Sequence, residues 1–203
     1  MAHPLQTVLD AASRLQDERR IAFLLVGDGA TREGLVRERD QRDLRTVVML
    51  EQQPRDRMAT LWSLCDVALV LLRRSPVLET ALPSKMLEAM AMGRPLIVAA
   101  EGEAHALVEA AGAGLAVAPE DPQALAEAVR YLAANPALAH EMGKRGRAWV
   151  EANHDRHRLA QALLGAIEGI CPPEHAVAPA ARRAHLGHWK RPNEWFSRRA
   201  DTF

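Results

Sequence analysis

Five short apolar runs, separated by helical segments, place the strongest constraint on what this chain can fold into. The runs are residues 21–26, 47–50, 67–72, 96–98 and 115–117, and the first stops at glycine. An unbroken apolar run ended by glycine is typical of a strand buried on both faces. Strands that alternate with helices predict an α/β fold, with a doubly wound, Rossmann-like parallel sheet of about five strands.

The segments between these runs have the periodicity and the end signals of helices. Apolar residues at i, i+3 and i+4 predict a helix after Leu5, and Gly93 is placed to end a helix over residues 84–92. Asp121 followed by Pro122 predicts a capped helix start. The remaining predicted helices cover residues 31–41, the segment from Pro54 to Leu64, 104–111, 136–152 and 155–169, and residues 73–82 are predicted to form a loop.

Composition limits the class of protein. Apolar residues make up 48% of the 203 residues and aromatic residues only 4%, so the core must consist mainly of Ala, Leu and Val. Lys plus Arg equals Asp plus Glu, at 26 each, and this balance argues against a nucleic-acid partner. The two cysteines are far apart, which favours a reduced, cytoplasmic setting without a disulfide or zinc site. No signal peptide or membrane-spanning run is predicted.

The composition changes after residue 170, so we expect one domain over residues 1–170 and a separate tail over residues 171–203. The tail has six Lys or Arg against three Asp or Glu, together with Trp189 and Trp195. It could dock on a partner domain or lie on the anionic inner face of a membrane. The alternative is a disordered or solvated end, which four prolines in the tail favour.

The loop before the helix at residues 84–92 is the best candidate for a ligand site. Ligands of open parallel sheets bind beyond the carboxyl ends of the strands, and a helix N-terminus there favours phosphate. Lys85 opposes the helix dipole unless an anion is bound, and Glu88 lies on the same face, where its carboxylate suits ribose hydroxyls. A solvated Lys85–Glu88 ion pair is the alternative, and Gly27-Asp28-Gly29 can likewise be only a tight turn.

In sequence order, these landmarks resemble the C-terminal half of family 4-type retaining glycosyltransferases of the GT-B fold, over roughly residues 5–170. The version with Pro-Ser-Lys before the glutamate is most similar to bacterial enzymes that build surface polysaccharide from N-acetylated UDP-hexosamines. The segments that resemble the family are residues 23–29 with "GDG", 47–50, 64–67, 82–97 with "LPSKMLEAMAMGRPLI", 112–125 with "GAGL" and "PED", and 142–147 with "MGKRGR".

The resemblance implies a binding site for a UDP-sugar. Glu88 corresponds to the glutamate that binds the ribose hydroxyls, and the backbone around Pro83, Ser84 and Lys85 meets the diphosphate and donor sugar. Such enzymes usually need no metal or other cofactor, because a helix dipole and basic side chains stabilise the leaving diphosphate. The other residues of the expected site are Leu82, Thr80, Gly27, and Leu50 with Glu51 beside the base.

Two departures from the family pattern limit what the resemblance implies. Many members have a glutamate eight positions before the one that matches Glu88, where this chain has Thr80, with Glu79 one residue away. The family's first strand, glycine loop and Arg/Lys pair of this domain, and its N-terminal acceptor domain, are expected before residue 5. A sheet without that strand would have an exposed edge.

Three functions follow as hypotheses. The first is the donor-binding half of a hexosyltransferase, which needs a separate N-terminal acceptor domain or subunit and is inactive alone. The second is a non-catalytic nucleotide-sugar-binding or interaction protein derived from such an enzyme. The third, a sugar-nucleotide epimerase, needs catalytic carboxylates and histidines that the sequence does not place. The catalytic residues are not identified.

Overall fold

The computed structural model describes residues 4–170. They divide into a compact unit that ends at Asp155 and a second unit that starts at Arg156, whose described part is helix α8 (Arg156–Ile170). The predicted tail, with Trp189 and Trp195, lies outside the described residues, so its docking or membrane role stays a prediction. No helix among residues 4–170 is long and apolar enough to cross a membrane.

The predicted alternation of strands and helices is confirmed. The strands are β1 (Phe23–Val26), β2 (Val47–Leu50), β3 (Ala68–Leu71), β4 (Leu96–Ala99) and β5 (Gly114–Val117). The helices of the compact unit are α1 (Gln6–Arg14), α2 (Arg32–Gln41), α3 (Met58–Leu64), α4 (Ser84–Ala91), α5 (Glu103–Ala110), α6 (Pro122–Ala134) and α7 (Pro136–Asn153), with short 3-10 turns at Arg55–Arg57 and Pro76–Leu78. Pro54 precedes the turn that leads into α3 and does not lie within the first turn of that helix.

The strands form two parallel sheets, where the sequence predicted one. β1 pairs with β2, with Phe23 opposite Val47, and the second sheet has the order β3-β4-β5. No strand pairing joins the two sheets among the described residues. The apolar runs therefore predicted the number and direction of the strands but not the break between β1 and β3. Strand pairing between distant segments is a tertiary property that local patterns do not encode.

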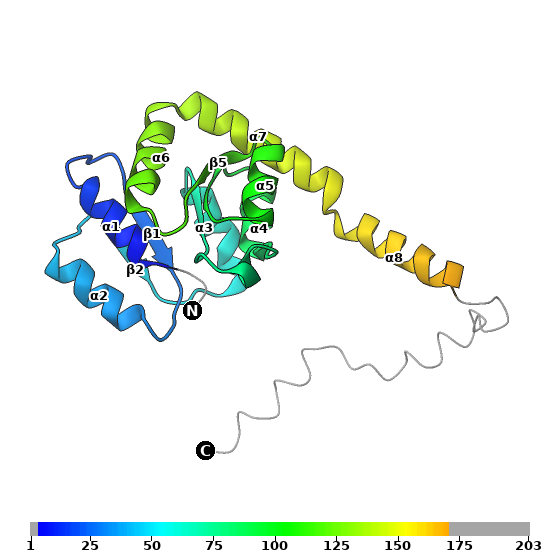
Figure 1. Ribbon diagram of the computed structural model, residues 1–203, viewed down its shortest axis with the longest axis horizontal. Coiled ribbons are helices and arrows are strands. Elements are labelled where there is room, and N and C mark those ends of the chain that lie inside the picture. Colours follow the sequence, from blue (N-terminus) through cyan, green and yellow to red (C-terminus); the bar gives the residue numbers. More distant parts are fainter. Residues whose placement is uncertain (1–3, 171–203) are drawn as a thin grey trace, which may run out of the picture. The chain divides into compact units, whose positions relative to one another are not determined.

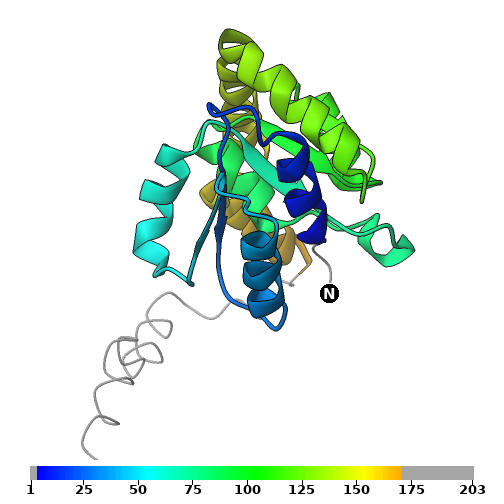
Figure 2. The same cartoon turned by 90° about the vertical axis from the view of Figure 1, so that its left-hand side faces the viewer.

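Two hydrophobic clusters lie on opposite faces of the strands. One joins α1 and α6 to one face of both sheets, through Phe23, Val47 and Ile97. The other joins α4 and α5 to the opposite face of β3 and β4, through Val70 and Val98. Figures 1 and 2 both show α1 next to α6. The β3-β4-β5 sheet is thus covered on both faces, as a parallel sheet requires.

The prediction that the first strand is buried on both faces is wrong. Of β1 only Phe23 is fully buried, and its odd-numbered residues face the cluster under α1. Leu24 and Val26 belong to neither cluster, and Val48 of β2, on the same face, is 46% exposed. Helix α3 has no buried residue, so it does not close this face. An apolar run shows that a strand can be buried, but the packing of neighbouring helices decides whether it is.

Helix ends follow the predicted signals. The carboxylate of Asp121 accepts hydrogen bonds from the backbone N–H groups of Gln123 and Ala124, both at 2.9 Å, and Pro122 is the first residue of α6. Gly93 ends α4 with a positive φ of 67°, and the N–H groups of Gly93 and Arg94 bond back to carbonyls of the last turn. Both predictions are confirmed, because such caps depend only on nearby residues.

Candidate functional site

The carboxyl end of β3 leads through a loop, residues 72–83, to the start of α4. Pro83 has an extended ψ of 130°, and no side chain caps the helix N-terminus. One face of α4 packs against the core through the buried side chains of Met86, Ala89 and Met90. The opposite face presents an exposed Glu88 one turn after a half-buried Lys85. The arrangement places a helix dipole, a cation and a carboxylate in sequence along one helix face.

Lys85 is half-buried, whereas Glu88 is exposed. Their i, i+3 spacing by itself would also fit a solvated ion pair on the helix surface. Burial lowers the pKa of Lys85 from its ordinary value of 10.5. A lysine that is partly desolvated at a helix N-terminus destabilises the free protein and gains when an anion binds beside it. Lys85 is therefore not a fully solvated side chain, and an anion site at this end of α4 stays a prediction.

The lowered pKa of the half-buried Lys85 predicts that the stability of the fold depends on pH. A lysine whose folded-state pKa is lowered costs the folded state most at low pH, where it is charged in both states. This cost falls as pH rises from the folded-state pKa towards 10.5. In urea unfolding at a series of pH values, the stability of the wild type relative to Lys85→Met should therefore rise over that window. A difference that is flat with pH would contradict a desolvated Lys85.

The site residues predicted on the first sheet form a separate group. Gly27 directly follows β1, and its N–H donates to the carbonyl of Leu50 at 3.2 Å, at the end of β2 beside the exposed Glu51. The N–H of Gly29 donates to the carboxylate of Asp28 at 2.7 Å, as in a local tight turn. The structure places Gly27, Leu50 and Glu51 together, and Thr80, Leu82, Pro83, Ser84, Lys85 and Glu88 on and before α4.

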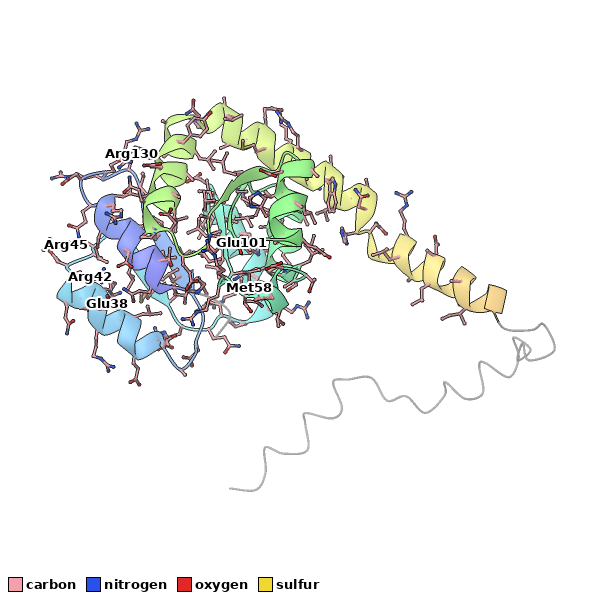
Figure 3. The ribbon with its side chains drawn as sticks, viewed as in Figure 1. Glu38, Arg42, Arg45, Met58, Glu101 and Arg130 are labelled. Carbon is pink, nitrogen blue, oxygen red and sulfur yellow. The ribbon has the colours of Figure 1, made fainter. Side chains whose placement is uncertain are left out.

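An ion pair and two hydrogen bonds join the loop before α4 to the segments that follow β4 and β5, at the carboxyl ends of the strands. Arg74 Nε lies 3.1 Å from a carboxylate oxygen of Glu101, which follows β4 and is labelled in Figure 3. The backbone N–H of Arg74 donates to the carboxylate of Glu120, which follows β5, at 3.3 Å. The carbonyl of Glu79 accepts a hydrogen bond of 2.6 Å from the N–H of Glu103, at the start of α5.

The sequence places the loops 72–84 and 99–103 at this edge, but it did not single out the side chains of Arg74, Glu101 or Glu120. The sequence has one weak signal in these loops. Gly102 lies between a predicted strand and a predicted helix, where a positive φ is often needed. Two shallow hollows of the described surface lie elsewhere. One is lined by Asp10, Ser13, Arg14, Arg42 and Pro122, and the other by residues near Arg39 and Leu44. Ser84 and Glu88 at the start of α4 are exposed, whereas Leu72 and Ala100, which directly follow β3 and β4, are buried.

No group of three His, Cys, Asp or Glu side chains among residues 4–170 is arranged to hold a metal ion. Lys85 and Glu88 lie on α4, and Arg74 and Glu101 lie in the loops that follow β3 and β4. They combine a cationic helix start with nearby carboxylates. Such an arrangement can bind a ligand that has both phosphate and hydroxyl groups, since phosphate favours the helix start and hydroxyls donate to carboxylates.

Comparisons with known proteins show the family and the fold of the chain. Residues 4–149 match the family model described as glycosyl transferases group 1. A curated relative from Escherichia coli strain K12, described as "Putative colanic acid biosynthesis glycosyl transferase WcaI", is 29% identical over 168 residues. The match covers 81% of this chain and 40% of the relative, so the chain spans well under half of that protein's length.

Solved structures of glycosyltransferases show the same fold. Sucrose-phosphate synthase from Thermosynechococcus elongatus superposes with a TM-score of 0.71 at 27% identity, over 83% of this chain and 42% of the synthase. HepE from Anabaena, solved with UDP and glucose, superposes with a TM-score of 0.67 at 20% identity, over 82% of this chain and 45% of HepE. The α/β fold is that of the C-terminal half of GT-B glycosyltransferases, and the chain belongs to the glycosyl transferases group 1 family.

Proposed function

We propose that this chain is the donor-binding half of a retaining, family 4-type hexosyltransferase whose donor is a UDP-sugar. The observation that carries the proposal is the start of α4, where a half-buried Lys85 and an exposed Glu88 lie one turn apart at the carboxyl edge of the sheet. Related structures support it, because HepE was solved with UDP and glucose and with UDP-glucose.

In this proposal each group of α4 binds one part of the donor. The diphosphate lies at the helix start beside Pro83 and Ser84, where the dipole and Lys85 stabilise the negative charge that develops on the leaving group. The ribose lies one turn further along, where its vicinal hydroxyls donate to the Glu88 carboxylate. The base lies towards Leu50 and Glu51, and the donor sugar near Leu82 and Thr80. No metal is required, since helix and lysine supply the positive charge.

Sugar transfer also needs an acceptor site, which we assign to a separate N-terminal domain or subunit. The E. coli relative is described as a glycosyl transferase of colanic acid biosynthesis, and this supports an acceptor in surface polysaccharide synthesis. We propose an N-acetylated hexosamine as the transferred sugar, on the Pro-Ser-Lys version of the motif. The 203-residue chain alone is then expected to bind donor without turnover.

Hydrogen exchange with and without UDP tests the proposal. UDP at millimolar concentration should slow amide exchange over residues 82–90, because a bound diphosphate occupies the start of α4 and orders the loop before it. Uridine, which has no phosphate, is the matched ligand and should protect this region much less. If the exchange of residues 82–90 is the same with and without UDP, the chain has no intact donor site.

A further inference from the structure

Arg74 links the loop before α4 to both neighbouring loops. Its side chain reaches Glu101 after β4, and its backbone N–H reaches Glu120 after β5. Arg73, the adjacent residue, is also exposed but has no such ion pair within the described residues. The contacts at Arg74 are therefore not a general consequence of basic residues at the end of β3.

Gly102 allows a second close contact of the same loop, between Glu79 and the start of α5. Its φ of 72° lies in the left-handed region, and a Cβ atom built there would be 2.0 Å from the carbonyl oxygen of Glu79. That carbonyl accepts the 2.6 Å hydrogen bond from the N–H of Glu103. The loop can approach the start of α5 this closely only because residue 102 has no side chain.

Glu120 provides a third observation, because its backbone is strained. Its φ is 59°, one of two positive values at non-glycine residues in the described chain. A non-glycine residue in this conformation costs the fold on the order of 1 kcal/mol compared with glycine. Its carboxylate accepts from the Arg74 N–H, so the strained residue supplies a contact that glycine could not.

We infer that Arg74, Gly102 and Glu120 are positioning residues of the donor site, which hold residues 73–83 so that α4 begins in the conformation that binds diphosphate. We call the contacts Arg74–Glu101, Arg74–Glu120 and Glu79–Glu103 the three-loop clamp. None of the three positioning residues needs to contact the donor. The inference rests on the proposed function, and it adds residues outside the α4 motif that set donor affinity.

Glu120→Gly separates a positioning role from a structural one. Glycine relieves the backbone strain but removes the acceptor of the Arg74 N–H, so thermal stability should be unchanged or higher. UDP affinity should nevertheless fall by about two- to tenfold, as expected for loss of one partly exposed, charge-assisted contact. Amides of residues 75–83 should exchange faster without ligand. A variant that keeps wild-type affinity and loop exchange overturns the inference.

Arg74→Ala and Arg73→Ala form a matched pair for loop exchange in the absence of ligand. Arg74→Ala should accelerate exchange in residues 75–83, Arg74→Lys should partly restore protection, and Arg73→Ala should leave it at the wild-type level. Equal effects of the two alanine variants on loop exchange would contradict the clamp.

Gly102→Ala should weaken UDP binding more than tenfold, because its Cβ displaces the Glu79 peptide. A wild-type chain that binds no UDP refutes the proposed function, whereas intact binding that Glu120→Gly leaves unchanged refutes only the clamp.

Discussion

Replacing Gly143 by alanine is expected to destabilise the compact unit by about 3 kcal/mol, because the added methyl group overpacks a closed helix contact. Gly143 lies in α7 at the point where this helix crosses the turn after α4. A Cβ atom there would be 2.1 Å from the carbonyl oxygen of Gly93 and 3.4 Å from Pro95. Neither neighbour is a flexible side chain, so α7 must move away from α4. Chemical unfolding followed by circular dichroism measures the loss.

Gly34→Ala is the matched control, since Gly34 also lies inside a helix but has no atom within 4 Å of its Cβ position. Alanine has the higher helix propensity, so this variant should be more stable by about 0.5–1 kcal/mol. The two glycine-to-alanine changes are thus expected to have opposite signs. If Gly143→Ala were as stable as wild type, the close approach of α7 to Gly93 would be wrong.

Replacing Glu88 by alanine is expected to weaken UDP binding by about 100-fold, with little change in stability. A 100-fold loss is about 2.8 kcal/mol, close to the lower end expected for two hydrogen bonds from ribose hydroxyls to a charged acceptor at about 1.5 kcal/mol net each, because Glu88 is exposed. The fold should persist because Glu88 is exposed on α4, while Met86, Ala89 and Met90 make the core contacts. Isothermal titration calorimetry with UDP measures the affinity, and a thermal melt checks the fold.

Two controls identify what Glu88 contacts. Glu109→Ala, which removes an exposed glutamate on α5, should leave UDP affinity unchanged. Wild type should prefer UDP over 2′-deoxy-UDP, and Glu88→Ala should lose that preference, because the carboxylate no longer distinguishes ribose from deoxyribose. If Glu88→Ala unfolds the chain, Glu88 is structural, and if the preference survives, another residue binds the 2′-hydroxyl.

Some parts of the fold depend on local chemistry and were predictable from the sequence. The cap at Asp121 and the glycine end of α4 at Gly93 involve groups within a few residues, so their sequence signals suffice. The "MG..GR" spacing in α7 was recognised only as a resemblance. The structure provides its physical reason, since Gly143 faces Gly93 and Gly146 lies against Ala113 and Met90.

The candidate site divides in the same way. Lys85 and Glu88 were identifiable because helix spacing places residues i and i+3 on one face. Arg74, Glu101 and Glu120 were not, because they are separated by 19 or more residues and meet only where three strands end. The N–H of Gly27 donates to the carbonyl of Leu50, and the contribution of Gly27 to the ligand site stays a prediction.

The sequence by itself determined the number and parallel direction of the strands and the ends of helices such as α4 and α6, because these depend on periodicity and on neighbours in the chain. The anion-binding start of α4 stays a prediction from the same local pattern. Only the tertiary structure decided that the strands separate into two sheets. It also decided that Leu24, Val26 and Val48, on one face of β1 and β2, belong to neither hydrophobic cluster of the described residues. The tertiary structure likewise decided which loops form an ion pair or hydrogen bonds with residues 73–83. Pairing and burial depend on segments far apart in sequence, whose approach is set by packing of the whole unit.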